Sequence, residues 1–247
     1  MILKLVTFDA TGTLLQFRGT VGSHYAKIAS KYSVNVQPRT LTKNFPLVFK
    51  RMLIEHPNFG ANNGIGWQHW WEQLVSRVIK DSLPGSVSIE SSTVNKISSD
   101  LIEIYSTKEC WKLADGAERL LEELSGRKFR LGVISNSDPR LGTILQDLNI
   151  KHYFDFVTVS FSVNCEKPDS AIFKAVEDMN VGIKKCEILH IGDNPKLDFM
   201  GARNVGWNAL LVANNSKVLN DFPSIEKDWV VDSIDEIYQV LENKNII

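Results

Sequence analysis

The chain has 247 residues, 43% of them hydrophobic, so it can bury one large core or a core with a sizeable insertion. Its 28 basic and 29 acidic residues leave a formal net charge of -1 and form no long run of one sign, which argues against a nucleic-acid or membrane-surface partner. The three cysteines are widely spaced and form no CxxC pair, which favours free thiols in a reducing compartment over a disulfide framework or a zinc site.

The apolar run at the N-terminus is interrupted by Lys4 and ends at Asp9, so it is too short for a signal peptide with its cleavage site. No later stretch approaches the roughly 18 apolar residues that a membrane-spanning helix needs. The sequence therefore predicts a soluble, cytoplasmic protein. Its oligomeric state is open, with a monomer favoured.

Residues Ile2–Phe8 are mostly apolar on both faces, as in a strand of a parallel sheet that is covered on both sides. The pattern then becomes helical. Apolar spacing predicts four helices in the next part of the chain: Val21–Tyr32, Arg39–Glu55, Trp67–Lys80 and Ser91–Tyr105. The loops HPNFGANNGIG and DSLPGS, rich in glycine and proline, separate the last three.

Strands and helices alternate after this helical stretch. Asp115 is a plausible N-cap for a helix over residues 116–128, and the strand RLGVIS follows it. Further strands are predicted over 154–161, 186–192, 207–212 and 228–232, and further helices over Ser170–Met179, Leu197–Asn204 and 234–241. This order predicts an α/β fold with a parallel-sheet core, residues 1–16 and 108–247, and an all-helical insertion, residues 17–107.

Polar side chains follow four of the apolar segments. In open α/β folds, ligands bind beyond the carboxyl ends of the strands. Taken singly, each group has an ordinary explanation in turn or helix-cap chemistry. Their occurrence together in one chain points to a single site, and the residues concerned are Asp9, Thr11, Ser135, Asn136, Lys167, Asp193 and Asp198.

Four motifs, FDATGT, VISNS, EKPD and IGDNPKLD, resemble motifs one to four of the haloacid dehalogenase superfamily, and the resemblance covers the whole chain. The opening, the WQHWW segment and the spacing of VISNS to IGDN make the chain similar to the rhythmically expressed gene 2 group of that superfamily. The resemblance implies a Rossmann-like core with an inserted helical cap of the C1 type. It also implies a hydrolase, most simply a phosphatase.

The residues suit metal-dependent phosphoryl transfer. Asp9 would supply the attacking oxygen and form an aspartyl-phosphate. Because its carboxylate and the phosphate repel each other, a divalent cation is needed between them, and Mg²⁺ fits because it takes hard oxygen ligands. Asp193 is the natural partner to hold the ion, with Asp198 supporting it directly or through a water. The resemblance adds the backbone carbonyl of Thr11 as a ligand.

The other site residues would bind the transferring group. The Ser135 hydroxyl and the Asn136 main-chain N–H are expected to hold phosphate oxygens, and Lys167 is expected to neutralise charge on Asp9 and on the phosphoryl group. The expected substrate is a small phosphorylated metabolite, whose identity the sequence leaves open.

Thr11 departs from the phosphatase pattern. Efficient phosphatases of the superfamily usually have a second Asp there, which protonates the leaving alkoxide and then activates water. A threonine hydroxyl does not titrate near neutrality, and acid–base help of this kind is worth roughly 10²- to 10⁴-fold in rate. Thr11 therefore argues for slow turnover, a substrate with a good leaving group, or an acid supplied by the cap or the substrate.

Two alternatives stay open. The protein could be a weakly active or inactive member that binds a phosphorylated ligand or a partner. It could also be a metal-free 2-haloacid dehalogenase, but that reaction would leave the Asp193 and Asp198 pair unexplained. His190, inside a predicted strand, is expected to be buried near the site and not to be a catalyst. Trp67 and Trp70 share a helix face, for which core packing is favoured over substrate contact.

Overall fold

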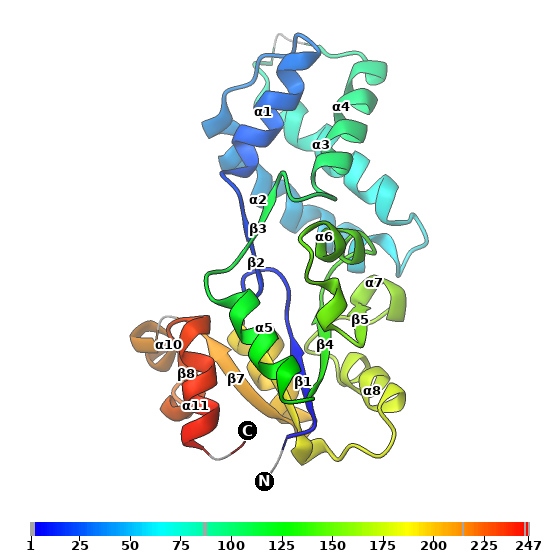
Figure 1. The fold of residues 1–247 in the computed structure, drawn as a ribbon. Helices are drawn as coiled ribbons and strands as arrows, with labels where there is room; N and C mark the ends of the chain where they lie inside the picture. The colour runs from blue at the N-terminus through cyan, green and yellow to red at the C-terminus, as the bar shows by residue number, and fades with distance from the viewer. Residues whose placement is uncertain (1–2, 86–87, 214, 245, 247) are drawn as a thin grey trace. The chain divides into compact units, whose positions relative to one another are not determined.

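The protein is described here by a computed structural model that covers residues 3–85, 88–213, 215–244 and 246 (Figure 1). It contains two compact units. The α/β unit comprises Met1–Gln16, Leu113–Asn136 and Leu148–Ile247, and the helical unit comprises Phe17–Lys112 and Ser137–Asp147. The sequence placed residues 108–112 and 137–147 in the α/β part, whereas the structure groups them with the helices. No helix in the described ranges is long and apolar enough to cross a membrane.

The α/β unit is built on a parallel sheet with the strand order β5-β4-β1-β6-β7-β8. Its strands are β1 (Leu5–Phe8), β4 (Arg130–Ser135), β5 (Phe156–Val159), β6 (Ile188–Gly192), β7 (Asn208–Val212) and β8 (Val230–Val231). A separate pair, β2 (Leu15–Phe17) and β3 (Trp111–Leu113), lies where the chain passes from one unit to the other. Because β1 lies between β4 and β6, the carboxyl ends of three motif-bearing strands are neighbours.

Helices and short turns connect and cover these strands. They are α5 (Ala117–Gly126), η2 (Lys151–Tyr153), α7 (Ser160–Val163), α8 (Ser170–Met179), η3 (Lys185–Glu187), η4 (Pro195–Met200), α9 (Gly201–Asn204), α10 (Asn215–Asp221), η5 (Lys227–Trp229), η6 (Ile234–Glu236) and α11 (Ile237–Asn243). On one face of the sheet, Leu5 and Ile188 pack with Phe173 of α8 and Phe199 of η4. Full burial of each such side chain contributes roughly 1.5–3 kcal/mol.

The helical unit is a bundle of α1 (Val21–Lys31), α2 (Pro38–Glu55), α3 (Trp67–Ser82), α4 (Ser91–Ile104) and α6 (Leu141–Asp147), with the short turn η1 (Asn58–Gly60) (Figure 1). The Ser23 N–H donates to the Thr20 side chain at 3.1 Å and the Thr20 N–H donates to the Ser23 hydroxyl at 3.2 Å, so a capping box starts α1. Trp70 is fully buried, as predicted for core packing, and its ring contacts Phe49 and Phe59. Trp67 is only half-buried.

Several predicted boundaries were wrong. The strand predicted over 154–161 ends at Val159, and α7 begins at Ser160. Asp115 does not cap α5, because Gly116 intervenes with a φ of +80° and the helix starts at Ala117. The helix predicted to begin at Leu197 begins earlier, because the Asn194 side chain accepts hydrogen bonds from the N–H groups of Lys196 and Leu197. Ile2, the predicted start of the first strand, lies outside the described residues.

Gly22→Ala tests the close contact between α1 and α2. Alanine is the better helix former by about 1 kcal/mol, but a Cβ at Gly22 would meet the Pro38 carbonyl and the Thr42 hydroxyl. We expect overpacking to prevail and to lower the free energy of unfolding by about 1–3 kcal/mol in urea denaturation. In the control Gly126→Ala, at the end of α5, the added Cβ meets nothing within 4 Å, so stability should hold or rise by up to about 1 kcal/mol. Equal stability of the two variants would contradict the close contact.

Candidate active site

Asp9 stands directly after the central strand β1, and its backbone N–H donates to the Ile191 carbonyl of β6 at 2.8 Å. The turn that follows is closed by bonds from Gly12 N–H to the Leu15 carbonyl, 2.9 Å, and from Leu15 N–H to the Ala10 carbonyl, 2.8 Å. Gly12 has a φ of +93°, and a Cβ there would collide with the Asp193 carboxylate. Only glycine therefore allows this turn to approach that carboxylate so closely.

Lys167 is the electrostatic centre of the site. It is 3% exposed, and its ammonium donates to Asp9 Oδ1 at 2.7 Å, to Asp198 Oδ1 at 2.6 Å and to the Ile134 carbonyl at 2.7 Å. Three acceptors match the three protons of an ammonium group. Burial works to lower the pKa of Lys167, but the two carboxylates outweigh it and hold that pKa above its ordinary value, so the group stays charged.

Asn136 fixes the backbone of Lys167. Its side-chain Nδ2 donates to the Lys167 carbonyl at 2.9 Å, and its Oδ1 accepts from the Lys167 N–H at 2.7 Å. The sequence predicted only a main-chain role for Asn136, so this side-chain function was missed. The neighbouring Ser135 ends β4 and is 2% exposed. Thr11, by contrast, is exposed in the turn after Asp9.

Three carboxylates meet here, because Asp9, Asp193 and Asp198 each offer an oxygen and these oxygens lie within 4.8 Å of one another. Among the described residues, Lys167 is the one ammonium paired with this cluster, so the three ionised carboxylates leave two excess negative charges. Burial, followed by the charges of Asp9 and Asp198, raises the pKa of Asp193 to about 6. Burial also raises the pKa of Asp9. These carboxylates lack counter-charge, which a divalent cation would supply.

Asp198 and Asp193 differ in what they bind. Asp198 Oδ1 accepts from Lys167 and from His190 Nε2, the latter at 3.2 Å, and Oδ2 accepts from the Asn194 N–H at 2.9 Å. Burial opposes ionisation of Asp198, but Lys167 and His190 keep its pKa well below the usual range. Asp193 has no ion-pair partner among the residues that the structure describes. The donor set therefore fits a cation held by Asp9 and Asp193, with Asp198 committed to Lys167.

The segment after Asn136 belongs to the helical unit and holds residues that the sequence did not single out. Trp71 Nε1 donates to Asp138 Oδ2 at 2.7 Å, and Arg140 Nε donates to Asp138 Oδ1 at 2.9 Å. The Arg140 guanidinium lies 4.4 Å from the centroid of a Trp71 ring. From the stretch SNSDPR the sequence analysis singled out only Ser135 and Asn136, and the Asp-x-Arg spacing that follows them was the signal available.

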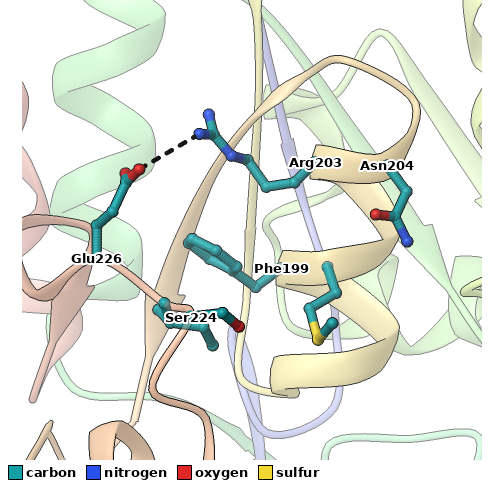
Figure 2. Close-up of a pocket in the computed structure, with 7 residues that line it drawn as sticks. Phe199, Arg203, Asn204, Ser224 and Glu226 are labelled. Atoms are coloured by element: carbon teal, nitrogen blue, oxygen red, sulfur yellow. Dashed lines mark ion pairs between the residues drawn. The ribbon is translucent and has the colours of Figure 1, made fainter.

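A separate pocket of about 160 Å³ lies in the α/β unit (Figure 2). Its walls come from the end of η4, from α9 and from the segment 224–226, with Arg203 and Glu226 paired at 3.9 Å across it. None of the predicted site residues lines this pocket, so it is distinct from the acidic cluster.

The chain matches the family model of the haloacid dehalogenase-like hydrolases over residues 3–206. It therefore belongs to this family, and it is a hydrolase. It is 36% identical to the rhythmically expressed gene 2 protein of Drosophila melanogaster, over 99% of this chain and 97% of that protein. It is 31% identical to the haloacid dehalogenase-like hydrolase domain-containing protein 3 of Homo sapiens, over 97% of this chain and 94% of that protein. These relatives confirm the group that the motifs indicated.

Solved structures share the fold. The crystal structure of YfnB from Bacillus subtilis, bound to magnesium, superposes with a TM-score of 0.70 at 15% identity and covers 98% of this chain and 100% of that chain. A 2-haloacid dehalogenase from Pseudomonas syringae superposes with a TM-score of 0.67 at 20% identity, over 98% of this chain and 100% of that chain. At these identities the likeness establishes the Rossmann-like α/β fold and leaves the reaction open.

Lys167→Met should destabilise the protein, whereas Asp9→Asn should not. We expect Lys167→Met to lower the free energy of unfolding by about 3–5 kcal/mol at neutral pH without divalent cations, because buried carboxylates lose their counter-charge. Without the ammonium, the pKa values of these carboxylates are raised. Near pH 5 protons therefore neutralise them, and the loss of stability should shrink. Asp9→Asn removes one excess negative charge and should be as stable as the unmodified protein or more so. Urea denaturation at both pH values measures this, and equal stability of the two variants would contradict the role of the ion pairs.

Proposed function

We propose that the protein is a Mg²⁺-dependent phosphohydrolase that acts on a small phosphorylated metabolite through an aspartyl-phosphate at Asp9. The observation that carries this proposal is the cluster of three carboxylates around the buried Lys167 ammonium at the end of β1. A phosphoryl group can approach Asp9 only if its negative charge is offset. Lys167 supplies one positive charge, and the two excess negative charges of the cluster favour a divalent cation.

The proposed cation site uses oxygen donors throughout. Asp9 and Asp193 would hold Mg²⁺ together with the Thr11 carbonyl. Asp198 would support the site indirectly, by accepting the hydrogen bond of the Lys167 ammonium. The absence of a side chain at Gly12 supports this arrangement, because a Cβ there would occupy the space beside the Asp193 carboxylate. When bound, Mg²⁺ would offset charge on the phosphoryl oxygens. The magnesium in the YfnB crystal structure supports this choice of ion for the fold.

The nucleophile is prepared by its neighbours. Lys167 binds Asp9 Oδ1, which orients the carboxylate and leaves Oδ2 for attack. In the proposed step a bond forms between Asp9 Oδ2 and phosphorus as the bond from phosphorus to the leaving oxygen breaks. Ser135 and the Asn136 N–H would hold the phosphoryl oxygens. Water then attacks phosphorus, releasing phosphate and restoring the Asp9 carboxylate.

Proton transfer is the weak point of this sequence of steps. The leaving alkoxide needs a proton, and the attacking water must lose one. Thr11 cannot carry either proton at neutral pH, so both must come from or go to solvent, the substrate or another residue. We therefore propose slow hydrolysis, or a substrate whose leaving oxygen needs little protonation. The helical unit would serve as the cap that limits access of water to the site.

Dehalogenation is the less favoured reaction. It shares the attack by a carboxylate, but no phosphate dianion has to be approached, so the excess negative charge around Asp193 would have no purpose. A ligand-binding protein without turnover is the stronger alternative, because Thr11 lacks the usual acid. The expected cytoplasmic setting, the monomeric state and the absence of nucleic-acid or membrane partners remain predictions from composition.

Phosphate release from small phosphomonoesters and an activated aryl phosphate tests the proposed reaction. We expect slow, Mg²⁺-dependent turnover that Asp9→Asn abolishes, because the nucleophile is lost. Thr11→Asp should accelerate it by roughly 10²-fold or more, because a titrating group is restored. Asp178→Asn, which changes an exposed acid of α8 that pairs with Lys174, is the matched control and should leave phosphate release unchanged. If the unmodified protein and Thr11→Asp both release no phosphate, the proposal fails and the ligand-binding alternative stands.

Cation binding should weaken as the pH falls through about 6, the value to which burial and neighbouring charges raise the pKa of Asp193. Protons and Mg²⁺ then compete for the same carboxylate, so the apparent Kd should rise about tenfold per pH unit below that point. Calorimetric titration with MgCl₂ between about pH 5 and 8 measures this. Asp193→Asn should bind weakly at every pH. A constant affinity in the unmodified protein would exclude Asp193 as the ligand.

A further inference from the structure

His190 is a fully buried titratable residue that the proposed reaction does not use. It lies in β6, where the strand register places it opposite Thr7 of β1, and both residues are 0% exposed. The Phe173 ring of α8 meets the imidazole edge-on, with 5.8 Å between ring centroids. A polar pair at such a position must find its hydrogen-bond partners inside the protein.

Both ring nitrogens of His190 have partners. Nδ1 lies 2.9 Å from the Thr7 hydroxyl, and Nε2 lies 3.2 Å from Asp198 Oδ1. A carboxylate oxygen can only accept a hydrogen bond, so Nε2 carries the ring proton and donates it to Asp198. In the neutral ring Nδ1 is then an acceptor, and the Thr7 hydroxyl donates a hydrogen bond to it. The other acceptor near that hydroxyl, the Leu189 carbonyl, is farther away at 3.3 Å. This tautomer satisfies both nitrogens.

A series of hydrogen bonds leads from His190 through Asp198 and Lys167 to Asp9. Asp198 Oδ1 receives the Lys167 ammonium as well as His190, and that ammonium also binds Asp9. Asp198 Oδ2 accepts from the Asn194 N–H, so both oxygens of Asp198 are fixed. Without the His190 donor, Oδ1 would be held by Lys167 alone. The carboxylate could then turn toward Asp193 and the cation position, and the ammonium would follow it away from Asp9.

We propose that His190 is a positioning residue, which fixes Asp198 and through it holds the Lys167 ammonium against Asp9. For its kinetic readout this inference rests on the proposed phosphohydrolase function. The geometry that supports it, a continuous series of buried hydrogen bonds from Thr7 to Asp9, is independent of that function. A side chain that merely filled the core would affect stability and leave the position of Lys167 unchanged.

Two amide substitutions test the Nε2 and Nδ1 hydrogen bonds of the imidazole one at a time. In His190→Gln the side-chain nitrogen can reach the place of Nε2 and donate to Asp198. In His190→Asn it reaches only the place of Nδ1, beside Thr7. We expect kcat of His190→Asn to fall roughly 10- to 100-fold, the loss typical of residues that orient an active-site group without touching the substrate. KM should change little. His190→Gln should stay close to the unmodified protein. Urea denaturation of both variants shows whether stability follows the same order.

A second measurement does not depend on turnover. In protein labelled with ¹⁵N-lysine, the buried Lys167 ammonium should give a protected resonance, assigned by its absence from Lys167→Arg. We expect this resonance to shift and exchange faster in His190→Asn but to persist in His190→Gln. If His190→Asn does not fold, Thr7→Val takes its place, because it deletes the hydroxyl that orients the imidazole. The same shift is expected there.

The outcomes separate the two proposals. An unchanged Lys167 resonance together with unchanged kcat in a folded His190→Asn or Thr7→Val protein overturns the positioning role. If the unmodified protein releases no phosphate from any ester, the phosphohydrolase proposal fails, and the NMR comparison alone decides on His190. A Lys167 resonance that shifts in His190→Asn but persists in His190→Gln supports the positioning role, whether or not phosphate is released.

Discussion

The site depends on one interaction, the contact of the Lys167 ammonium with two carboxylates inside the α/β unit. A buried ion without a partner costs several kcal/mol, so neither the ammonium nor the carboxylates could occupy this place alone. Their mutual contacts at 2.6 and 2.7 Å make burial tolerable, and the third carboxylate, Asp193, leaves the cluster short of positive charge. The proposed function uses that deficit, because a divalent cation would offset it and would allow an anionic group to approach Asp9.

The surrounding fold is arranged to support this contact. β1 lies between β4 and β6, so the loops after all three strands converge on Asp9. Two glycines, Gly12 and Gly192, leave room for carboxylates, since a Cβ at either position would collide with Asp193 or Asp198. The Asn136 amide then fastens the Lys167 backbone to the end of β4. Each of these features concerns the placing of charge and adds little to the apolar core.

The elements that sequence predicted well are those with a strong local pattern. The helices of the insertion were predicted within a few residues, because their apolar spacing and end signals are local. The residues of the site could be gathered because parallel strands bring their carboxyl ends to one edge. What was missed depends on partners far along the chain. The Asn136 side chain meets Lys167, and Gly116 lies against Asp235, and no local pattern records either contact.

The attachment of residues 137–147 to the helical unit has a mechanical consequence. The chain crosses between the units at four places, and one of them is the peptide bond between Asn136 and Ser137. Beyond that bond, Asp138 is tied to Trp71 and Arg140 within the helical unit, and before it, the Asn136 amide holds Lys167. At this crossing, one peptide bond separates a residue of the helical unit from Asn136, whose side chain holds the Lys167 backbone. Strain in the backbone at this bond would therefore act on Asn136, and through Asn136 on the residue whose ammonium binds Asp9.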